Sequence, residues 1–115
     1  MKTIRIKRGD IVLINIPESD NHTIYGLRPH IVVSNNTANK NSQIITVVPL
    51  ISKPKKQLPT HITIEGFGLT KPSTVLTEQL YSVDKSLINK RIGHISDAAI
   101  MKKITKCLGI QLDVA

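Results

Sequence analysis

The longest apolar run of the chain, residues 43–52, constrains the fold more than any other feature. It is rich in isoleucine and valine, and β-branched side chains in a run of this length favour a buried strand. Pro49 has no N–H to give to a strand ladder, so we expect a bulge or a strand end there that exposes the backbone of residues 50–52. We place this strand at the centre of the core.

Other apolar or alternating segments predict further short strands separated by polar loops. The expected strands are residues 11–16, 28–34, 60–64, 73–80 and 90–95. The polar segments 17–23 and 35–42 are expected to be loops, and the first is long enough to act as a flap. Residues 83–87 are expected to turn as a short helical piece capped by Asp84.

A clear amphipathic helix follows near the C-terminal end. Ser96 is the expected N-cap, Asp97 suits the positive end of the helix dipole, and Gly109 is the expected end. Apolar side chains at helical spacing lie opposite several lysines, and they are Ile100, Met101, Ile104, Cys107 and Leu108. Cys107 is interpreted as a small core residue. The sequence therefore predicts a mainly β single domain over residues 1–115, packed as a small, bent antiparallel barrel with a C-terminal helix.

The charge balance points to polyanionic partners. Lys and Arg number 16 against 8 Asp and Glu, which gives a net charge of +8, although a merely soluble basic protein has the same balance. Aromatic residues are limited to Tyr25, Phe67 and Tyr81, so stacking of several bases is not expected. One cysteine excludes an internal disulfide, and no window reaches the length of a membrane span. We expect a soluble cytoplasmic protein.

The stretch Gly26-Leu27-Arg28-Pro29-His30 stands directly ahead of an apolar run and looks like a functional site. A flexible glycine and a rigid proline around an arginine fix a permanent cation at the rim of a sheet. Arg28 could instead be structural and pair with Glu18 or Glu78. Arg8-Gly9-Asp10 is interpreted as a turn with an Arg–Asp contact.

Several motifs in series resemble the MazF/PemK toxins, which are ribonucleases of bacterial toxin–antitoxin pairs. The similarity runs from about residue 5 to residue 112. The motifs that carry it are Lys7-Arg8-Gly9-Asp10-Ile11-Val12, Gly26-Leu27-Arg28-Pro29-His30-Ile31-Val32-Val33, Val47-Val48-Pro49-Leu50-Ile51-Ser52, Leu58-Pro59-Thr60-His61 and Glu78-Gln79-Leu80.

This resemblance implies a homodimer with the SH3-like barrel of the CcdB/PemK type that cleaves single-stranded RNA at short sequences without a metal ion or other cofactor. It places the catalytic arginine at Arg28. The family's catalytic hydroxyl comes from a threonine where this chain has Ile51, and Ser52 is the nearest hydroxyl. Either Ser52 replaces that threonine by a one-residue shift or the site is weakened. Tyr81 is a second departure, because many relatives carry a basic residue there.

Metal-free RNA cleavage needs the 2′-hydroxyl to attack in line, the phosphorane charge to be neutralised and the 5′-oxygen to gain a proton. Arg28 suits the second task as an electrostatic clamp, since a guanidinium cannot act as a base at neutral pH. Ser52 could hold a phosphate oxygen or orient the 2′-hydroxyl. His30 and His61 lie near these motifs, and their ordinary pKa suits proton transfer near neutrality. Alternatively, each is a strand residue that faces solvent or a partner. The expected substrate-binding residues are Gly26, His30, Lys53, Lys55, Lys56, His61, Glu78 and Gln79.

The three lysines at 53, 55 and 56 are either an ordinary solvated loop or cations that follow a phosphate backbone. Three functions remain open. The first is a sequence-specific endoribonuclease toxin, neutralised by an antitoxin whose acidic segment covers the basic groove and through which any DNA binding would occur. The second is a catalytically inactive relative that binds RNA, DNA or an antitoxin. The third is a topoisomerase-binding toxin of the CcdB type.

Overall fold

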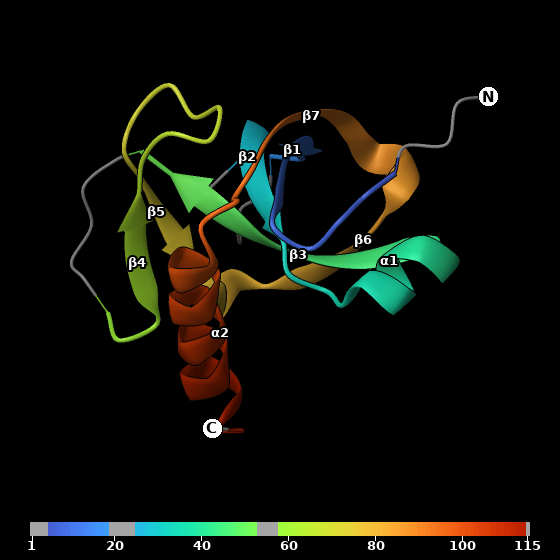
Figure 1. Ribbon diagram of the computed structural model, residues 1–115. Coiled ribbons are helices and arrows are strands. Elements are labelled where there is room, and N and C mark those ends of the chain that lie inside the picture. The colour runs from blue at the N-terminus through green and yellow to red at the C-terminus, as the bar shows by residue number, and fades with distance from the viewer. Residues whose placement is uncertain (1–4, 19–24, 53–57, 115) are drawn as a thin grey trace.

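The computed structural model describes residues 5–18, 25–52 and 58–114, and the described chain contains seven strands, two α-helices and two 3-10 helices (Figure 1). The strands are β1 (Asp10–Ile16), β2 (Gly26–Val32), β3 (Ile44–Ile51), β4 (His61–Ile64), β5 (Ser73–Leu76), β6 (Tyr81–Asp84) and β7 (Ile88–His94). The helices are α1 (Asn36–Asn41), η1 (Thr77–Gln79), η2 (Lys85–Leu87) and α2 (Ala98–Leu112). No helix in these described ranges is long and apolar enough to cross a membrane.

The strands form an antiparallel sheet in the order β4-β5-β3-β2-β1-β7, and β6 pairs with β3 outside this path. The expected class, mainly β with a C-terminal helix, is confirmed. Closure of the expected barrel is not found among the described strands, because β4 and β7 end the path without pairing to each other. Figure 1 shows β3 crossing the middle of the molecule, with α2 standing beside it and α1 at the far side.

The proline in β3 marks a change of partners rather than a strand end. Pro49 pairs with His30 of β2, and the strand continues to Ile51. On its other side β3 pairs with β6 up to Val47 and with β5 from Leu50. Pro49 stands between these two pairings, where a missing N–H removes no bond from either ladder. The predicted bulge is therefore wrong.

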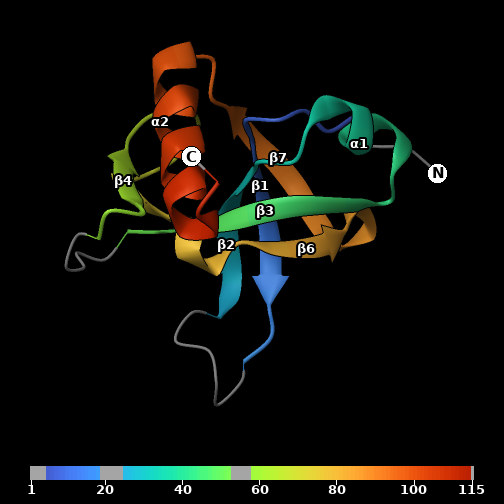
Figure 2. The ribbon, with the colours of Figure 1, turned by 90° about the horizontal axis from the view of Figure 1, so that it is seen from below.

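Two apolar clusters on opposite faces explain why β1, β2 and β3 read as nearly continuous apolar runs. Neighbouring residues of a strand point to opposite faces, so Ile11 lies in one cluster and Val12 in the other. Ile104 of α2 belongs to the first cluster and is fully buried. Both faces of the central strands are thus covered, one of them by α2, which lies across the strands in Figure 2.

Helix α2 keeps its predicted apolar stripe but has different ends. Ile104 and Cys107 are buried, as expected. Asp97, not Ser96, is the N-cap, because its carboxylate accepts from the N–H groups of Ala99 and Ile100. The helix passes through Gly109 and ends at Leu112. Asp113 then takes the left-handed conformation (φ 55°) and its N–H binds the carbonyl oxygens of Gly109 and Ile110.

Two of three other local expectations are wrong. The loop expected at 35–42 contains α1, whose N-cap Asn35 accepts from the N–H of Ala38, and the amide nitrogen of buried Asn39 donates to the Ser34 carbonyl. The strand expected over 73–80 stops at Leu76 and becomes η1. The predicted short helical piece capped by Asp84 is confirmed as η2, which begins at Lys85 because Val83 and Asp84 belong to β6.

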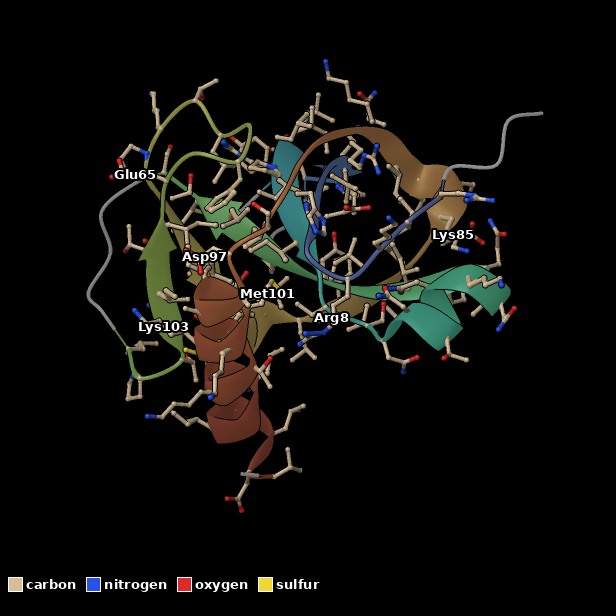
Figure 3. The ribbon with its side chains drawn as sticks, in the orientation of Figure 1. Arg8, Glu65, Lys85, Asp97, Met101 and Lys103 are labelled. Atoms are coloured by element: carbon tan, nitrogen blue, oxygen red, sulfur yellow. The ribbon has the colours of Figure 1, made fainter. Side chains whose placement is uncertain are left out.

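The Arg8-Gly9-Asp10 turn forms, but without the expected Arg–Asp contact. The Asp10 carboxylate accepts from the N–H of Lys7 at 2.8 Å and from Nδ1 of His94 at 2.7 Å. Arg8 points elsewhere: its Nε donates to the carbonyl of Val33 and its Nη2 to the hydroxyl of Thr105 on α2. Figure 3 shows Arg8 in this position beside α2. Arg8 is therefore a cross-link between the N-terminal segment and α2.

Candidate active site

One cavity of about 470 Å³ brings Arg28 and Ser52 together. We call it the Arg28 cavity. It lies between β2, β7, the end of β3 and the loop that connects β4 to β5. Its lining residues are Leu13, Arg28, Pro29, Leu50, Ser52, Gly68, Leu69, Thr70, Lys71, Ser73, Lys90 and Ile92. Three cations and three hydroxyls thus line a floor built from apolar side chains.

Strand register places one wall of this cavity. Leu13 of β1 lies opposite Pro29 of β2 on one side and opposite Lys90 of β7 on the other. Residues directly opposite each other in an antiparallel pair share a face of the sheet. The three side chains therefore form one row across three strands, with a cation at its end.

A close backbone crossing places the other wall. A Cβ atom on Gly68 would overlap the backbone of Ile92, and one on Gly93 would overlap the backbone of Phe67. Glycine at both positions lets the β4–β5 loop touch β7 directly. The loop is thereby held over the sheet, and Thr70 and Lys71 line the cavity.

Arg28 is exposed, and its Nε donates to the carbonyl oxygen of Tyr25 at 3.0 Å. Gly26 between them has φ of 88°, a conformation that side-chain-bearing residues rarely adopt, so the glycine shapes the turn that holds Arg28. No carboxylate of the described residues forms an ion pair with Arg28. The alternative in which Arg28 pairs structurally with Glu18 or Glu78 is therefore not observed.

Ser52 directly follows β3, is exposed and lines the cavity. Ile51 is partly buried, pairs with Thr74 of β5 and does not line the cavity. The hydroxyl that shares a cavity with Arg28 is thus the one at position 52.

His30 lies behind Arg28 rather than in the cavity. The side chain is fully buried, its Nδ1–H donates to the carbonyl oxygen of Arg28 at 2.9 Å, and its Nε2 accepts from the hydroxyl of Tyr81 at 2.8 Å. Burial lowers the pKa of His30 from 6.5 to about 4, against a smaller opposite effect of the bond to the Arg28 carbonyl. Its interpretation as a proton-transfer group near neutrality, or as a solvent-facing residue, is wrong: it is a neutral, buried link.

His61 and Glu78 form a second buried link, away from the Arg28 cavity. The N–H of Leu58 donates to Nδ1 of His61 at 3.2 Å, so Nε2 carries the hydrogen that the Glu78 carboxylate accepts at 2.9 Å. The Sγ atom of Cys107 lies 3.8 Å from the His61 carbonyl oxygen. This arrangement joins β4, η1 and α2. The interpretation of His61 as solvent-facing is wrong.

The remaining expected substrate-binding residues divide into two groups. Gly26 and Gln79 are described, and neither lines the Arg28 cavity. Lys53, Lys55 and Lys56 lie outside the described residues.

Sequence reasoning missed two cations of the cavity, Lys71 and Lys90. Lys71 precedes a proline, Pro72, and Lys90 precedes another cation, Arg91, but neither pattern indicates which cavity the side chain lines. Their placement depends on the row through Leu13 and on the Gly68–Gly93 crossing. Within the described part of the chain, no group of three His, Cys, Asp or Glu side chains could hold a metal ion.

The fold and the cavity define a small antiparallel β protein with a cationic, hydroxyl-lined cleft. Residues 7–112 match the family described as PemK-like, MazF-like toxins of type II toxin–antitoxin systems, and the chain belongs to this family. It is homologous to the endoribonuclease MazF of Staphylococcus saprophyticus, with 30% identity over 110 residues that cover 93% of this chain and 91% of the relative.

Solved structures share the fold. MazF from Deinococcus radiodurans superposes with a TM-score of 0.80 at 21% identity, covering 96% of this chain and 99% of that one. An endoribonuclease from a mycobacterial species, solved in complex with its cognate antitoxin, gives a TM-score of 0.79 at 22% identity, covering 96% of this chain and 97% of that one. The family resemblance inferred from the motifs is confirmed.

Proposed function

We propose that this toxin is a metal-independent endoribonuclease that cleaves single-stranded RNA at short sequences, with Arg28 and Ser52 as its catalytic residues. The observation that carries this proposal is the cavity that Arg28 and Ser52 share with Lys71 and Lys90. Family membership supplies the reaction class.

The reaction follows from the groups present. The 2′-hydroxyl of one nucleotide attacks its own 3′-phosphate in line, and the bond from phosphorus to the 5′-oxygen breaks. The 2′-hydroxyl passes its proton to water as it attacks, the 5′-oxygen takes a proton from water as it leaves, and the other fragment ends in a cyclic phosphate. Negative charge grows on the phosphorane oxygens, where Arg28 can donate two parallel hydrogen bonds and Ser52 one. Arg28 remains charged throughout, so it acts as a clamp.

Two lysines can support the same step, Lys90 from the wall formed by the strands and Lys71 from the wall formed by the β4–β5 loop. Lys71 and Lys90 line the cavity that holds Arg28. Phosphate groups on either side of the cleaved bond would find a cation on each wall, which fixes the strand before reaction. Because Leu13, Leu50 and Ile92 also line the cavity, the charged groups lie beside apolar side chains, where electrostatic stabilisation is stronger than in open water.

The partners follow from the same site. We infer that a cognate antitoxin binds this toxin, as one binds the mycobacterial endoribonuclease, and that it neutralises the toxin by covering the basic surface with an acidic segment of complementary charge. We further infer a homodimer that acts on mRNA in the cytoplasm and reaches DNA only through the antitoxin. The second candidate function is an inactive relative that binds RNA without cutting it, which Ile51 in place of the family's threonine favours.

The test is incubation of the purified chain with a long single-stranded RNA in EDTA, with the fragment ends mapped. We expect discrete cuts by the wild type and a loss of roughly a hundredfold or more in rate for Arg28→Ala. The matched control is Lys103→Ala, which removes one positive charge from an exposed position of α2. Intact RNA despite measurable binding would support the inactive relative instead.

A further inference from the structure

Two further cavities continue from the Arg28 cavity along β7 and around the N-terminal segment. The first, which we call the β7 cavity, has a volume of about 520 Å³ and is lined by Lys7, Asp10, Arg91, Ile92, Gly93 and His94. The second, the α1 cavity, has a volume of about 480 Å³ and is lined by Arg5, Ile6, Lys7, Asn36, Asn39, Lys40 and Lys85.

Neighbouring cavities share lining residues, and we call the three together the path. Ile92 lines both the Arg28 cavity and the β7 cavity, and Lys7 lines both the β7 cavity and the α1 cavity. The path therefore leaves the proposed cleavage site at β7 and ends between α1 and η2. Figure 3 shows Lys85 at this end of the molecule, on the far side of the view from Lys103 of α2.

The path is strongly cationic. Its side chains of fixed positive charge beyond the Arg28 cavity are Arg5, Lys7, Lys40, Lys85 and Arg91. The one carboxylate in either lining, Asp10, is fully buried and already accepts from the N–H of Lys7 and from Nδ1 of His94, with Arg91 Nη1 at 3.7 Å. An anion in the path would thus meet exposed or partly exposed cations, whereas the buried Asp10 carboxylate is already bonded to Lys7 and His94.

We propose that the β7 and α1 cavities together form a track for the phosphate backbone of the RNA strand that extends from the cleavage site. This inference rests on the proposed function, since it assigns the strand's path at that same site. Two features favour RNA backbone over a compact anion: the cations are spread over two cavities, and the β7 cavity shares Ile92 with the Arg28 cavity. Phosphate contacts of this kind hold a strand without reading its bases.

The track makes binding depend on RNA length and salt. A hexanucleotide centred on the cleavage sequence occupies the Arg28 cavity, whereas an RNA several times longer also enters the track. Each phosphate neutralised on a single strand contributes about −0.7 to the slope of log K against log salt. Removing three track cations should lower the magnitude of that slope by about 2 for the long RNA.

The experiment measures binding by fluorescence anisotropy with 2′-O-methyl RNAs, which lack the attacking hydroxyl and cannot be cut. The track variant is Lys7→Gln/Lys40→Gln/Lys85→Gln, and the matched control is Lys102→Gln/Lys103→Gln/Lys106→Gln on the exposed face of α2. We expect the track variant to lose on the order of tenfold or more in the ratio of long-RNA to short-RNA affinity. The control should keep the wild-type ratio.

Three results would overturn the track. One is an unchanged ratio in the track variant, and another is an equal loss in the control, which would indicate a field spread over the whole surface. The third is unchanged RNA binding with lost binding of an acidic peptide, which would assign the surface to a protein partner. Because binding is measured on uncleavable RNA, failure of the track is distinguishable from failure of the proposed cleavage, which the fragment mapping tests.

Discussion

The hydroxyl of Tyr81 donates to Nε2 of His30 across 2.8 Å, and this bond links β6 to the strand that carries Arg28. The two rings meet edge to face, with centroids 5.6 Å apart and planes at 69°. The opposite nitrogen of His30 donates to the carbonyl oxygen of Arg28. Arg28 is therefore held at two points, at its side-chain Nε by the carbonyl oxygen of Tyr25 and at its own carbonyl oxygen by Tyr81 through the His30 ring.

Removing the Tyr81 hydroxyl should disturb this positioning. We expect Tyr81→Phe to lower kcat several-fold with little change in KM, because Arg28 itself remains, and to lower the free energy of unfolding by about 1 kcal/mol. The measurement that separates positioning from general weakening is the nitrogen NMR spectrum of His30. Its Nε2 resonance should move in Tyr81→Phe, and an unmoved resonance would contradict the link.

Burial of a neutral His30 should make the protein less stable in acid. The unfolded chain takes up this proton at the ordinary pKa of 6.5, whereas the folded chain does so only at about 4. Between these values the unfolded state binds more protons, so the free energy of unfolding falls as the pH falls from 6.5 to 4. The full effect is about 3 kcal/mol.

Urea denaturation across this pH range measures the effect, with His30→Gln as the comparison. The variant is expected to be less stable at neutral pH but to have a shallower dependence between pH 6.5 and 4, because the other titrating groups are common to both proteins. Parallel curves would show that His30 is not the group responsible.

The His61–Glu78 contact should contribute to folding. Glu78→Gln keeps the shape of the side chain but removes the charge that faces the Nε2–H of buried His61, so we expect a loss of about 1–3 kcal/mol in the free energy of unfolding. A double-mutant cycle with His61→Gln should show coupling, and strict additivity would contradict the contact. Glu65→Gln, at the exposed position labelled in Figure 3, is the control and should change stability little.

The caps of α2 give a direct test of its observed start. Asp97→Ala removes the acceptor of two N–H groups at the first turn, so we expect a loss of about 1 kcal/mol. Ser96→Ala, one residue earlier, should have little effect. Thermal denaturation of both variants decides between the two positions. A larger loss of stability in Ser96→Ala than in Asp97→Ala would show that Ser96 is the cap.

Patterns of residues close together in the sequence were sufficient to predict much of the fold. The apolar runs located β1 and β3 because both faces of those strands are buried, and the stripe through Ile104 and Cys107 located α2. Short local hydrogen bonds were harder to foresee. The Asn35 cap converts an asparagine-rich segment into α1, and the Thr77 hydroxyl, which donates to the Thr60 carbonyl, accompanies the turn of the chain into η1.

The candidate site was predicted in part for a similar reason. Arg28 and Ser52 stand in motifs that can be read along the chain, and both line the cavity. Lys71 and Lys90 reach it through the contact between Gly68 and β7, which joins segments far apart in sequence. The burial of His30 likewise depends on Tyr81, fifty-one residues later. Such placements are set by tertiary packing, which local residue types do not encode.

The last prediction concerns which of two neighbouring positions supplies the catalytic hydroxyl. His30 lies opposite Pro49, so the two share a face, and alternation along β2 and β3 places Arg28 and Ile51 on that face as well. Ser52 follows the strand and lines the Arg28 cavity, which Ile51 does not. Alternation therefore puts a side chain at position 51 on the face of Arg28, whereas the cavity lining favours the hydroxyl at position 52.

We accordingly expect Ser52→Ala to slow RNA cleavage by roughly a hundredfold, as the loss of one donor to a developing oxyanion typically does, whereas Ser52→Thr should retain most activity. Ile51→Thr should bring no gain, alone or combined with Ser52→Ala, because position 51 does not line the Arg28 cavity. Single-turnover cleavage of one RNA in EDTA measures all four variants. Restoration of the Ser52→Ala rate by threonine at 51 would show instead that the strand end can turn, and that the family's position for the hydroxyl still serves this site.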